Sequence, residues 1–440
     1  MSSVVIGEPA SKTQRGFALR LLSLITDLHA GEAVTAFLLT ANVFVLLASY
    51  YVLKTVREAL ILSEAGAQVK SYSAAGQALL LLAVVPLYGF VATKATRSKL
   101  ITWVTLFFVA NLAVFYLMGS AGFQVGVAFF LWVGIFNVLV TAQFWAYAND
   151  LYTEESGKRI FPMVGIGSSL GAWLGAVLAG RLFSVMNAYQ LMLVAMGGLL
   201  LSIVLVRRID SRRKGSPEPP PKPLSNKGGF SMVLSSRYLL LIALMVLMFN
   251  LVNSLGEYIL SEMVVTHTKA AVDAGVIPSS QMKASIGTFY GDFYGWVNLV
   301  GLLIQVFVVS RLFKTIGVRG ALFVLPLIAL GSYTLMAILP VLGVIRIAKV
   351  LENSTDYSIQ NTARHALFLP TSREAKYKAK AAIDTFFWRV GDMLQGGFVL
   401  VGTWLAFTAR HFAWINIVLV SVWLALIVGI YREHKKLVKA

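Results

Sequence analysis

The sequence predicts an all-α polytopic membrane protein with twelve transmembrane helices arranged as two halves of six. Hydrophobic residues make up 58% of the chain and charged residues only 13%, with a mean hydropathy of +0.75. Soluble domains typically carry about 25% charged residues, so this chain has too little polar surface to face water on every side. Apolar segments of about 20 residues, the length of a bilayer-spanning helix, recur on both sides of a proline-rich linker. Soluble enzymes and soluble nucleic-acid-binding proteins are therefore excluded.

Charge and cysteine content narrow the function further. The net charge is +18, from 38 Lys and Arg against 20 Asp and Glu, and the basic residues lie mainly in loops between apolar segments, as in membrane proteins. The sequence contains no cysteine, which excludes a disulfide framework, a thiolate metal site and a cysteine nucleophile. The five histidines lack the spacing of metal ligands on a helix face. We expect no enzymatic centre, metal site, cofactor or nucleic-acid partner, and a lipid bilayer as the surroundings.

Twelve apolar segments have the length that a membrane-spanning helix needs. No short apolar segment with a small-residue cleavage site precedes the first, so no removable signal peptide is expected. Lys and Arg concentrate in alternate loops and in both terminal segments, which predicts cytoplasmic termini by the positive-inside rule. The expected spans are 33–53, 73–92, 100–119, 123–146, 161–183, 188–206, 238–262, 284–310, 320–339, 341–365, 378–408 and 411–431.

A linker divides the chain into halves of nearly equal length. Residues 217–223 read Pro-Glu-Pro-Pro-Pro-Lys-Pro, which forbids a helix and favours an extended tether. We expect an N-terminal six-helix half over 1–206, a cytoplasmic linker over 207–237 and a C-terminal six-helix half over 238–440. The halves show weak internal similarity and share one orientation. This layout is typical of the major-facilitator architecture, in which two halves rock around a site at the membrane midplane and spans 1, 4, 7 and 10 line the cavity.

Glycines recur at four-residue spacing in span 5, at Gly167, Gly171 and Gly175. The segment lacks the Lys-Ser/Thr ending of a phosphate-binding loop, and no strand precedes it. The spacing instead favours close approach of a neighbouring helix.

Ionisable residues within the spans mark a candidate solute pathway, because such residues are costly in lipid and usually face a cavity or a partner. In span 10, six polar residues fall on one stripe of the helix, about 120° wide at 100° per residue: Arg346, Lys349, Glu352, Asn353, Asp356 and Gln360. Spans 1 and 7 carry polar stripes too, and the architecture places all three spans at the cavity. Their members, with those of span 11, are Asn42, Ser49, Tyr50, Lys54, Arg57, Asn250, Asn253, Ser254, Glu257, Ser261, Asp384, Arg389, Asp392 and Gln395.

The basic members of these stripes leave three interpretations open. Five positive charges at membrane depth suit an anion such as a phosphate ester, which arginine can bind bidentately. Alternatively, the same groups pair with acids as salt bridges that hold the halves together. In the third interpretation, an acid such as Glu257 carries a coupling proton. The five basic residues are Lys54, Arg57, Arg346, Lys349 and Arg389.

Three parts of the chain resemble the ATP/ADP translocases of plastids and intracellular bacteria and their relatives in free-living bacteria. Tyr51-Val-Leu-Lys-Thr-Val-Arg-Glu-Ala-Leu-Ile-Leu62 resembles their first span. Phe144-Trp-Ala-Tyr-Ala-Asn-Asp150, followed by residues 157–159, resembles the segment after span 4. Lys378-Ala-Lys-Ala-Ala-Ile-Asp384, preceded by residues 369–374, resembles the segment before span 11. The resemblance covers most of both halves.

The resemblance implies a twelve-span exchanger that moves ATP against ADP or related nucleotides, placed in the inner membrane of a bacterium. It implies that Lys54 and Arg57 stand at the family's basic positions in the first span. It also implies that Lys380 and Asp384 belong to the family's block before span 11.

The leading hypothesis is a monomeric alternating-access secondary transporter of an anionic metabolite, most specifically a nucleotide exchanger. One alternative is a proton-coupled major-facilitator-type transporter of another solute. A second is a membrane sensor or scaffold that transports nothing. The residues expected to bind substrate are Lys54, Arg57, Arg346, Lys349, Arg389, Lys380 and Asn250, and those expected to act in gating or coupling are Glu257, Glu352, Asp356, Asp384 and Asp392.

Overall fold

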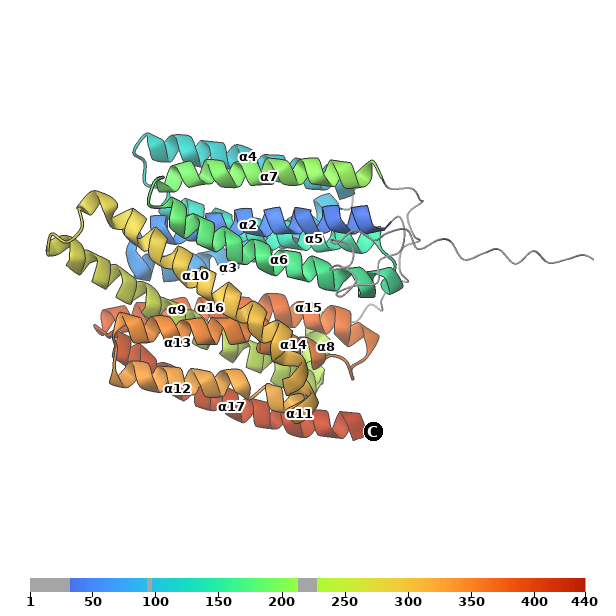
Figure 1. Cartoon of the computed structure of the whole chain (residues 1–440). Coiled ribbons are helices and arrows are strands. Elements are labelled where there is room, and N and C mark those ends of the chain that lie inside the picture. The colour runs from blue at the N-terminus through green and yellow to red at the C-terminus, as the bar shows by residue number, and fades with distance from the viewer. Residues whose placement is uncertain (1–31, 93–96, 213–227, 440) are drawn as a thin grey trace, which may run out of the picture.

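The computed structural model describes residues 32–92, 97–212 and 228–439, and within them the chain is helical and has no strand. The long helices lie side by side in one bundle (Figure 1). Eight of the described helices are long and apolar enough to cross a membrane. A ninth span results when α10 (Met282–Phe307) and α11 (Val309–Ala321), which meet at a bend of 77°, are counted together. The prediction of an all-α polytopic membrane protein is confirmed.

Six helices form the N-terminal half. Side chains satisfy backbone groups where some of them begin: Asn187 accepts from the backbone N–H of Gln190, and the Gln190 side chain accepts from that of Asn187, which fixes the start of the sixth helix. The six are α2 (Ala33–Glu64), α3 (Gly66–Ala92), α4 (Arg97–Ser120), α5 (Gly126–Leu151), α6 (Glu154–Leu182) and α7 (Ala188–Asp210).

The C-terminal half is less regular. It contains three π-helical turns, a form of helix that is frequent at functional sites, and such turns divide two of its long helical stretches into shorter segments. Three of the twelve expected spans remain beside these nine. One of the three is short, and the other two are the stretches divided by π-helical turns. The count of twelve therefore stays a prediction, and the order of the helices agrees with it. The elements besides α10 and α11 are α8 (Gly229–Ser235), α9 (Arg237–Asp273), η1 (Ser279–Gln281), α12 (Val324–Ile338), α13 (Leu342–Thr355), η2 (Asp356–Gln360), α14 (Asn361–Ala366), η3 (Ala375–Ala379), α15 (Lys380–Ala382), η4 (Ile383–Phe387), α16 (Trp388–Trp404) and α17 (Ala409–Lys439).

Several helices extend beyond the apolar segments that predicted them. α2 continues to Glu64 and only Ala65 separates it from α3, because Gly66 adopts a φ of +84°, which favours glycine. Residues 54–72, expected to lie between spans 1 and 2, are therefore almost entirely helical. α9 likewise continues to Asp273, through part of the expected 263–283 loop. A hydropathy window detects only the apolar part of a helix, whereas the hydrogen-bonded helix continues into its polar ends.

The glycines of α6 pack against α2. A Cβ atom at Gly171 or Gly175 would collide with the backbone of Phe44 or Ala48, and one at Gly167 would collide with Thr40. The close-packing interpretation of this spacing is confirmed.

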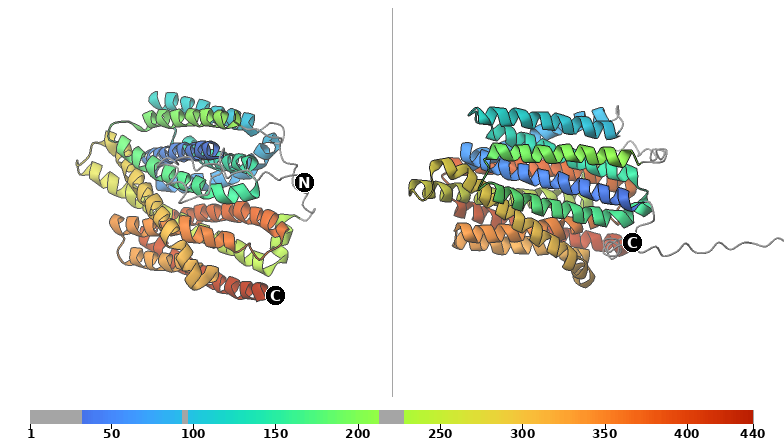
Figure 2. Two further views of the ribbon diagram at one scale, coloured as in Figure 1. Left: turned by 45° about the vertical axis from the view of Figure 1, so that its right-hand side comes forward. Right: turned by 45° about the horizontal axis from the view of Figure 1, so that its top comes forward.

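Two hydrophobic cores lie on either side of a contact between the halves. One consists of N-half residues, and the other is built mainly from the C-half. Both views in Figure 2 show α2 to α7 beside the elements that follow α8, with α10 crossing between them. α6 packs on α10, where Gly180 faces Gly291, and α3 packs on α16. The end of the bundle where α7 stops at Asp210 and α8 starts at Gly229 is called the linker end below; residues 213–227 of the linker lie outside the described residues.

Candidate functional site

A cavity of about 220 Å³ lies between the two halves. α2 and α3 supply its N-half wall, and α9, α10, α13, η2 and α16 supply its C-half wall. Of the residues predicted to bind substrate or to act in gating, Lys54, Arg57 and Glu257 line it. Other members of the predicted polar stripes line it too: Asn253, Ser254, Asn353 and Gln395. Its full lining is Lys54, Arg57, Glu58, Lys70, Ser71, Ala74, Asn253, Ser254, Glu257, Tyr258, Tyr294, Asn353, Tyr357 and Gln395.

Lys54 is surrounded by aromatic rings. Its Nζ atom lies 4.0 Å from the ring centroid of Tyr294 and 5.1 Å from that of Tyr51, and it donates a hydrogen bond to the Tyr357 hydroxyl at 3.4 Å. Cation–π contacts stabilise an ammonium group but do not neutralise it. Among the described residues, no carboxylate forms an ion pair with Lys54, so its charge is available to a ligand.

Two further cations on the same wall share one carboxylate. Arg57 forms an ion pair and hydrogen bonds with Glu58, whose side chain is fully buried, and Lys70 lies 2.6 Å from the other oxygen of Glu58. Lys70 also donates to Ser261 of the C-half at 2.8 Å. With Lys54, this wall therefore carries three positive charges and one negative charge.

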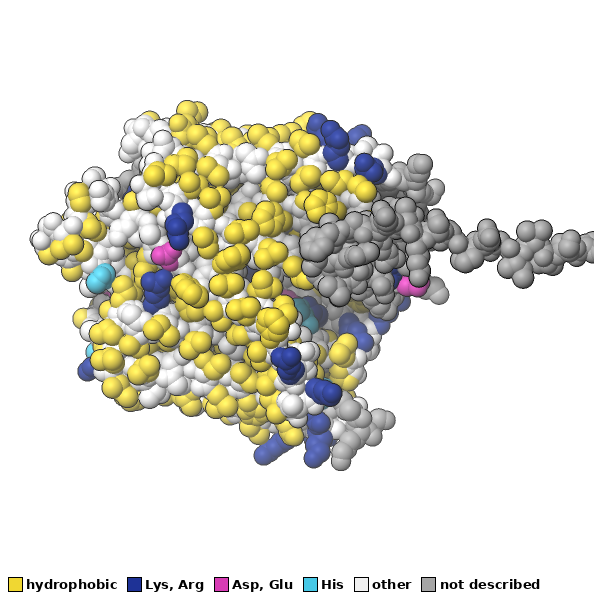
Figure 3. Space-filling view, viewed as in Figure 1, with side chains coloured by type: hydrophobic (Ala, Val, Ile, Leu, Met, Phe, Trp, Pro, Cys, Tyr) yellow, Lys and Arg dark blue, Asp and Glu magenta, His cyan; other side chains and the backbone are white. Residues whose placement is uncertain are grey.

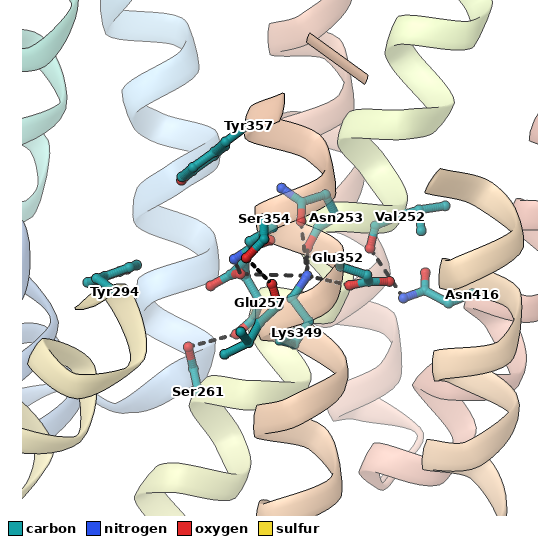
Figure 4. Close-up of polar contacts among 12 residues, drawn as sticks. Val252, Asn253, Glu257, Ser261, Tyr294, Lys349, Glu352, Ser354, Tyr357 and Asn416 are labelled. Atoms are coloured by element: carbon teal, nitrogen blue, oxygen red, sulfur yellow. Dashed lines mark hydrogen bonds and ion pairs between the residues drawn. The ribbon is translucent and has the colours of Figure 1, made fainter. Parts of the chain in front are cut away.

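Behind the opposite wall lies Lys349, fully buried in a network of acids and amides (Figure 4). Lys349 Nζ lies 2.8 Å from Glu352, 3.6 Å from Glu257 and 2.9 Å from the side-chain oxygen of Asn253. Asn353 donates to Glu257 at 2.9 Å. Here one cation serves two carboxylates, so Lys349 has no free charge to offer a ligand.

Span 11 contributes a second satisfied pair. Arg389 lies 3.2 Å from Asp392, which also accepts hydrogen bonds from Asn250 at 2.8 Å and from Ser254 at 3.3 Å. Of these four residues only Ser254 lines the cavity.

The remaining predicted residues lie away from the cavity. Arg346 packs over the ring of Phe289, 5.3 Å from its centroid. Asp356 and Glu352 line a small separate void on the other side of α13. Lys380 pairs with Asp384 at 2.6 Å near the linker end. The structure thus assembles three groups from the predicted set: the cavity lining, the buried Lys349 network and the linker-end pair.

Sequence reasoning missed Lys70, Tyr294 and Tyr357 as cavity residues. Lys70 was assigned to a loop, although four helical residues precede it in α3. The two tyrosines are uncharged and lie outside the polar stripes from which the site was predicted. Their signal was spacing: Tyr294 shares a helix face with the buried Tyr290 and Asn298, four residues away on either side.

Polar contacts join the halves on the side of the cavity away from the linker end. Lys283 of α10 lies 2.8 Å from Glu64 of α2 and donates to Tyr189 of α7 at 3.1 Å. Glu64 also accepts the backbone N–H of Gly126. Gln395 donates to Ser71 across the halves at 2.8 Å. The Lys283 contacts and the Gln395–Ser71 hydrogen bond therefore join the two halves beside the cavity.

The fold matches that of solved transporters. The POT family transporter PepTSo superposes with a TM-score of 0.63 at 13% identity, over 91% of this chain and 98% of that one. A bacterial homologue of the human lysosomal transporter Spinster gives 0.61 at 14% identity, over 93% and 99%. The nucleoside transporter NupG gives 0.60 at 12% identity, over 89% and 98%. At these identities the likeness shows the fold alone, and it confirms a major-facilitator-like architecture.

Sequence relatives point to one family. ADP,ATP carrier protein 1 of Chlamydia pneumoniae is 22% identical over 345 residues, which are 66% of this chain and 63% of that one. ADP,ATP carrier protein 5 of Rickettsia felis is 23% identical over 469 residues, covering 88% and 90%. The chain spans about three fifths of the length of the chlamydial relatives. Residues 199–434 match the model of the TLC ATP/ADP transporter family. Because that match covers more than half of the chain, this multi-pass membrane protein belongs to the TLC ATP/ADP transporter family.

Proposed function

We propose that the protein is an alternating-access transporter that exchanges nucleotides of the ATP/ADP type across a membrane and binds them in the cavity between its halves. The named relatives are ADP,ATP carriers, and the fold is that of transporters. The protein acts as a monomer, without a nucleic-acid partner and without chemical conversion of its substrate.

The observation that carries the proposal is the unpaired charge of Lys54. It lies in the cavity beside Arg57 and Lys70, whose only shared acid is Glu58. Ammonium and guanidinium groups bind phosphate oxygens through short charge-assisted hydrogen bonds. The rings of Tyr294 and Tyr357, which line the cavity beside Lys54, offer flat apolar faces against which a base can pack.

The surplus charge also gives a reason for exchange rather than net uptake. Closing the halves over an empty cavity would remove uncompensated cations from water, which is costly. A bound phosphate chain neutralises these cations and lowers that cost. The cavity of about 220 Å³ is smaller than the roughly 300–1,000 Å³ of typical small-molecule pockets, so the halves must separate further to admit a nucleotide.

Uptake of labelled ATP into proteoliposomes tests the proposal. The vesicles are preloaded with ADP, with phosphate or with buffer alone, and each loading is repeated with and without a pH gradient. We expect uptake only with ADP inside. Equal uptake into empty vesicles, or no uptake by folded protein under any loading, would contradict nucleotide exchange.

A second candidate function is proton-coupled transport of another solute. One observation favours it: Glu257 lines the cavity and also contacts the buried Lys349, so its protonation would weaken a contact that holds α9 against α13. The pH gradient in the same experiment separates the two functions, because only this one allows accumulation driven by the gradient alone.

We also propose that the linker end is cytoplasmic and that the membrane is a bacterial inner membrane. In Figure 3 the Lys and Arg side chains gather mainly near the end that holds the C terminus, and the flank between the ends is mostly hydrophobic, which is the pattern of the positive-inside rule. The sequence lacks cysteine, so a single introduced thiol reports its side of the membrane. A membrane-impermeant thiol reagent should label Val276→Cys in intact cells and Lys436→Cys only after permeabilisation; the reverse pattern would invert the topology.

A further inference from the structure

A second cluster of charges lies near the linker end of the C-half, outside the cavity. The guanidinium of Arg364 on α14 packs over the indole of Trp388, 5.0 Å from its centroid. It lies 3.8 Å from one oxygen of Asp384, while Lys380 holds the other oxygen at 2.6 Å. Two cations thus share one carboxylate, and the three groups carry a net charge of +1.

Three buried donor atoms of this cluster lack a hydrogen-bond partner. Two are Nε and Nη1 of Arg364, of which Nη1 has only the 3.8 Å ion pair with Asp384. The third is the side-chain nitrogen of Gln360, a residue that lies one helical turn before Arg364 and is 1% exposed. Buried donors without partners are costly and rare in native structures. Three such donors beside the surplus positive charge of Arg364 and Lys380 indicate a place for an anion.

The cluster continues the cavity along one helix. Asn353 and Tyr357 line the cavity, and Gln360 and Arg364 follow three and seven residues after Tyr357 on the same continuous helical stretch, through the π-helical turn η2 and into α14. From Tyr357 to Arg364 is about 10 Å along the helix at 1.5 Å per residue. An anion held at Arg364 is therefore near the linker side of the cavity but separate from Lys54.

The geometry points to a second phosphate-binding station, formed by Arg364, Lys380 and Gln360 over Trp388, which holds the phosphate chain of a nucleotide on the linker side before it reaches Lys54. The planar fork of arginine matches two phosphate oxygens. This inference rests on nucleotide exchange for its physiological ligand, but anion binding at the station can be measured without transport.

Trp388 supplies the readout, because an anion at Arg364 alters the surroundings of its indole. Pyrophosphate, which resembles the phosphate chain and does not absorb where tryptophan is excited, is titrated into the purified full-length chain and into Trp388→Phe. The difference between the two titrations isolates Trp388 from the other tryptophans. We expect a saturable signal, weakened about tenfold or more in affinity by Arg364→Gln. The matched control Arg373→Gln removes an exposed charge from the same end and should leave the signal unchanged.

Further variants separate the station from the cavity and from misfolding. Lys54→Gln should reduce nucleotide exchange about 100-fold and keep the Trp388 signal. Arg364→Lys keeps the charge without the fork and should give intermediate affinity even if Arg364→Gln fails to fold. In exchange assays, Arg364→Gln should raise the half-saturating nucleotide concentration on the linker side and leave that on the other side unchanged.

Several outcomes would overturn the station. The first is an unchanged affinity for pyrophosphate in both Arg364 variants. The second is a loss of pyrophosphate affinity in Arg373→Gln as large as that in Arg364→Gln. The third is an affinity for inorganic phosphate equal to that for pyrophosphate, which would assign the cluster to a free anion. If the unmodified chain showed the Trp388 signal but no nucleotide exchange, the proposed function would be contradicted, whereas the anion site would still be supported.

Discussion

The two walls of the cavity use the same kinds of residue to opposite effect. On the α2 and α3 wall, three cations accompany a single carboxylate, and Lys54 touches only aromatic rings and a hydroxyl. On the α13 wall, Lys349 is fully buried between two carboxylates. The first wall therefore has a charge to offer a ligand, whereas the second is neutralised within the protein. An intramembrane lysine is thus a candidate binding residue only once its partners are known.

Removal of the buried cation should have the largest effect. Lys349→Met leaves Glu257 and Glu352 without a counter-charge, and breaking a buried ion pair in this way costs about 3–5 kcal/mol of unfolding free energy. Thermal unfolding in detergent measures it, with the exposed Lys376→Met as control. Adding Glu352→Gln should restore part of the loss. An unchanged melting temperature for Lys349→Met would show that the two walls do not differ as described.

Removal of the free cation should affect transport rather than folding. Lys54→Gln should reduce nucleotide exchange about 100-fold, equal to about 2.8 kcal/mol, because the phosphate loses its unshared partner. The melting temperature should change little, since the only hydrogen bond lost is the 3.4 Å contact with Tyr357. Lys54→Arg should retain part of the activity. If Lys54→Gln exchanged nucleotides at the rate of the unmodified protein, the α2 and α3 wall would not be part of the binding site.

The aromatic surroundings of Lys54 provide a finer test. Tyr294→Leu removes the closest ring, and a cation–π contact is worth about 0.5–2 kcal/mol, so the half-saturating nucleotide concentration should rise several-fold. Tyr294→Phe keeps the ring and loses only a 3.4 Å contact with Glu58, so it should match the unmodified protein. Equal effects of the two changes would mean that the hydroxyl matters rather than the ring.

The contact between Lys283 and Glu64 should give the smallest effect. It joins the halves, but 29% of the Lys283 side chain is exposed, and such pairs contribute about 1 kcal/mol or less. Lys283→Ala should therefore open the side away from the linker about fivefold more often. The reaction rate of Ala74→Cys, in the cavity wall, with an impermeant thiol reagent added from that side would report the opening. Swapping the two charges, as Lys283→Glu together with Glu64→Lys, should restore the original labelling rate. A labelling rate that neither Lys283→Ala nor the swap changes would show that the pair does not hold the halves together.

The sequence was a good guide to the helices and a partial guide to the site. Polar stripes predicted that spans 1, 7, 10 and 11 reach the cavity, and α2, α9, α13 and α16 do contribute to its lining. The lining residues include none from α5, the expected span 4, whereas α3 and α10 contribute without a predicted stripe. Lys70 lies outside the expected span 73–92 but inside α3, because the helix begins at Gly66, before the apolar segment does. Arg346 was included because it shares a stripe with Lys349, yet it packs over Phe289 at another level of the helix.

Composition and periodicity determined by themselves that this chain is a helical membrane protein, because continuous apolar segments of about 20 residues cross a bilayer as helices, in which each backbone group is paired within the segment. They also determined which faces of those helices are polar, since that depends on spacing along one helix. Only the tertiary structure decided which charges neutralise one another. Glu58 reaches both Arg57 and Lys70, and Glu257 meets Lys349 rather than Lys54. Those pairings depend on distances between helices far apart in the sequence, which no pattern along a single helix contains.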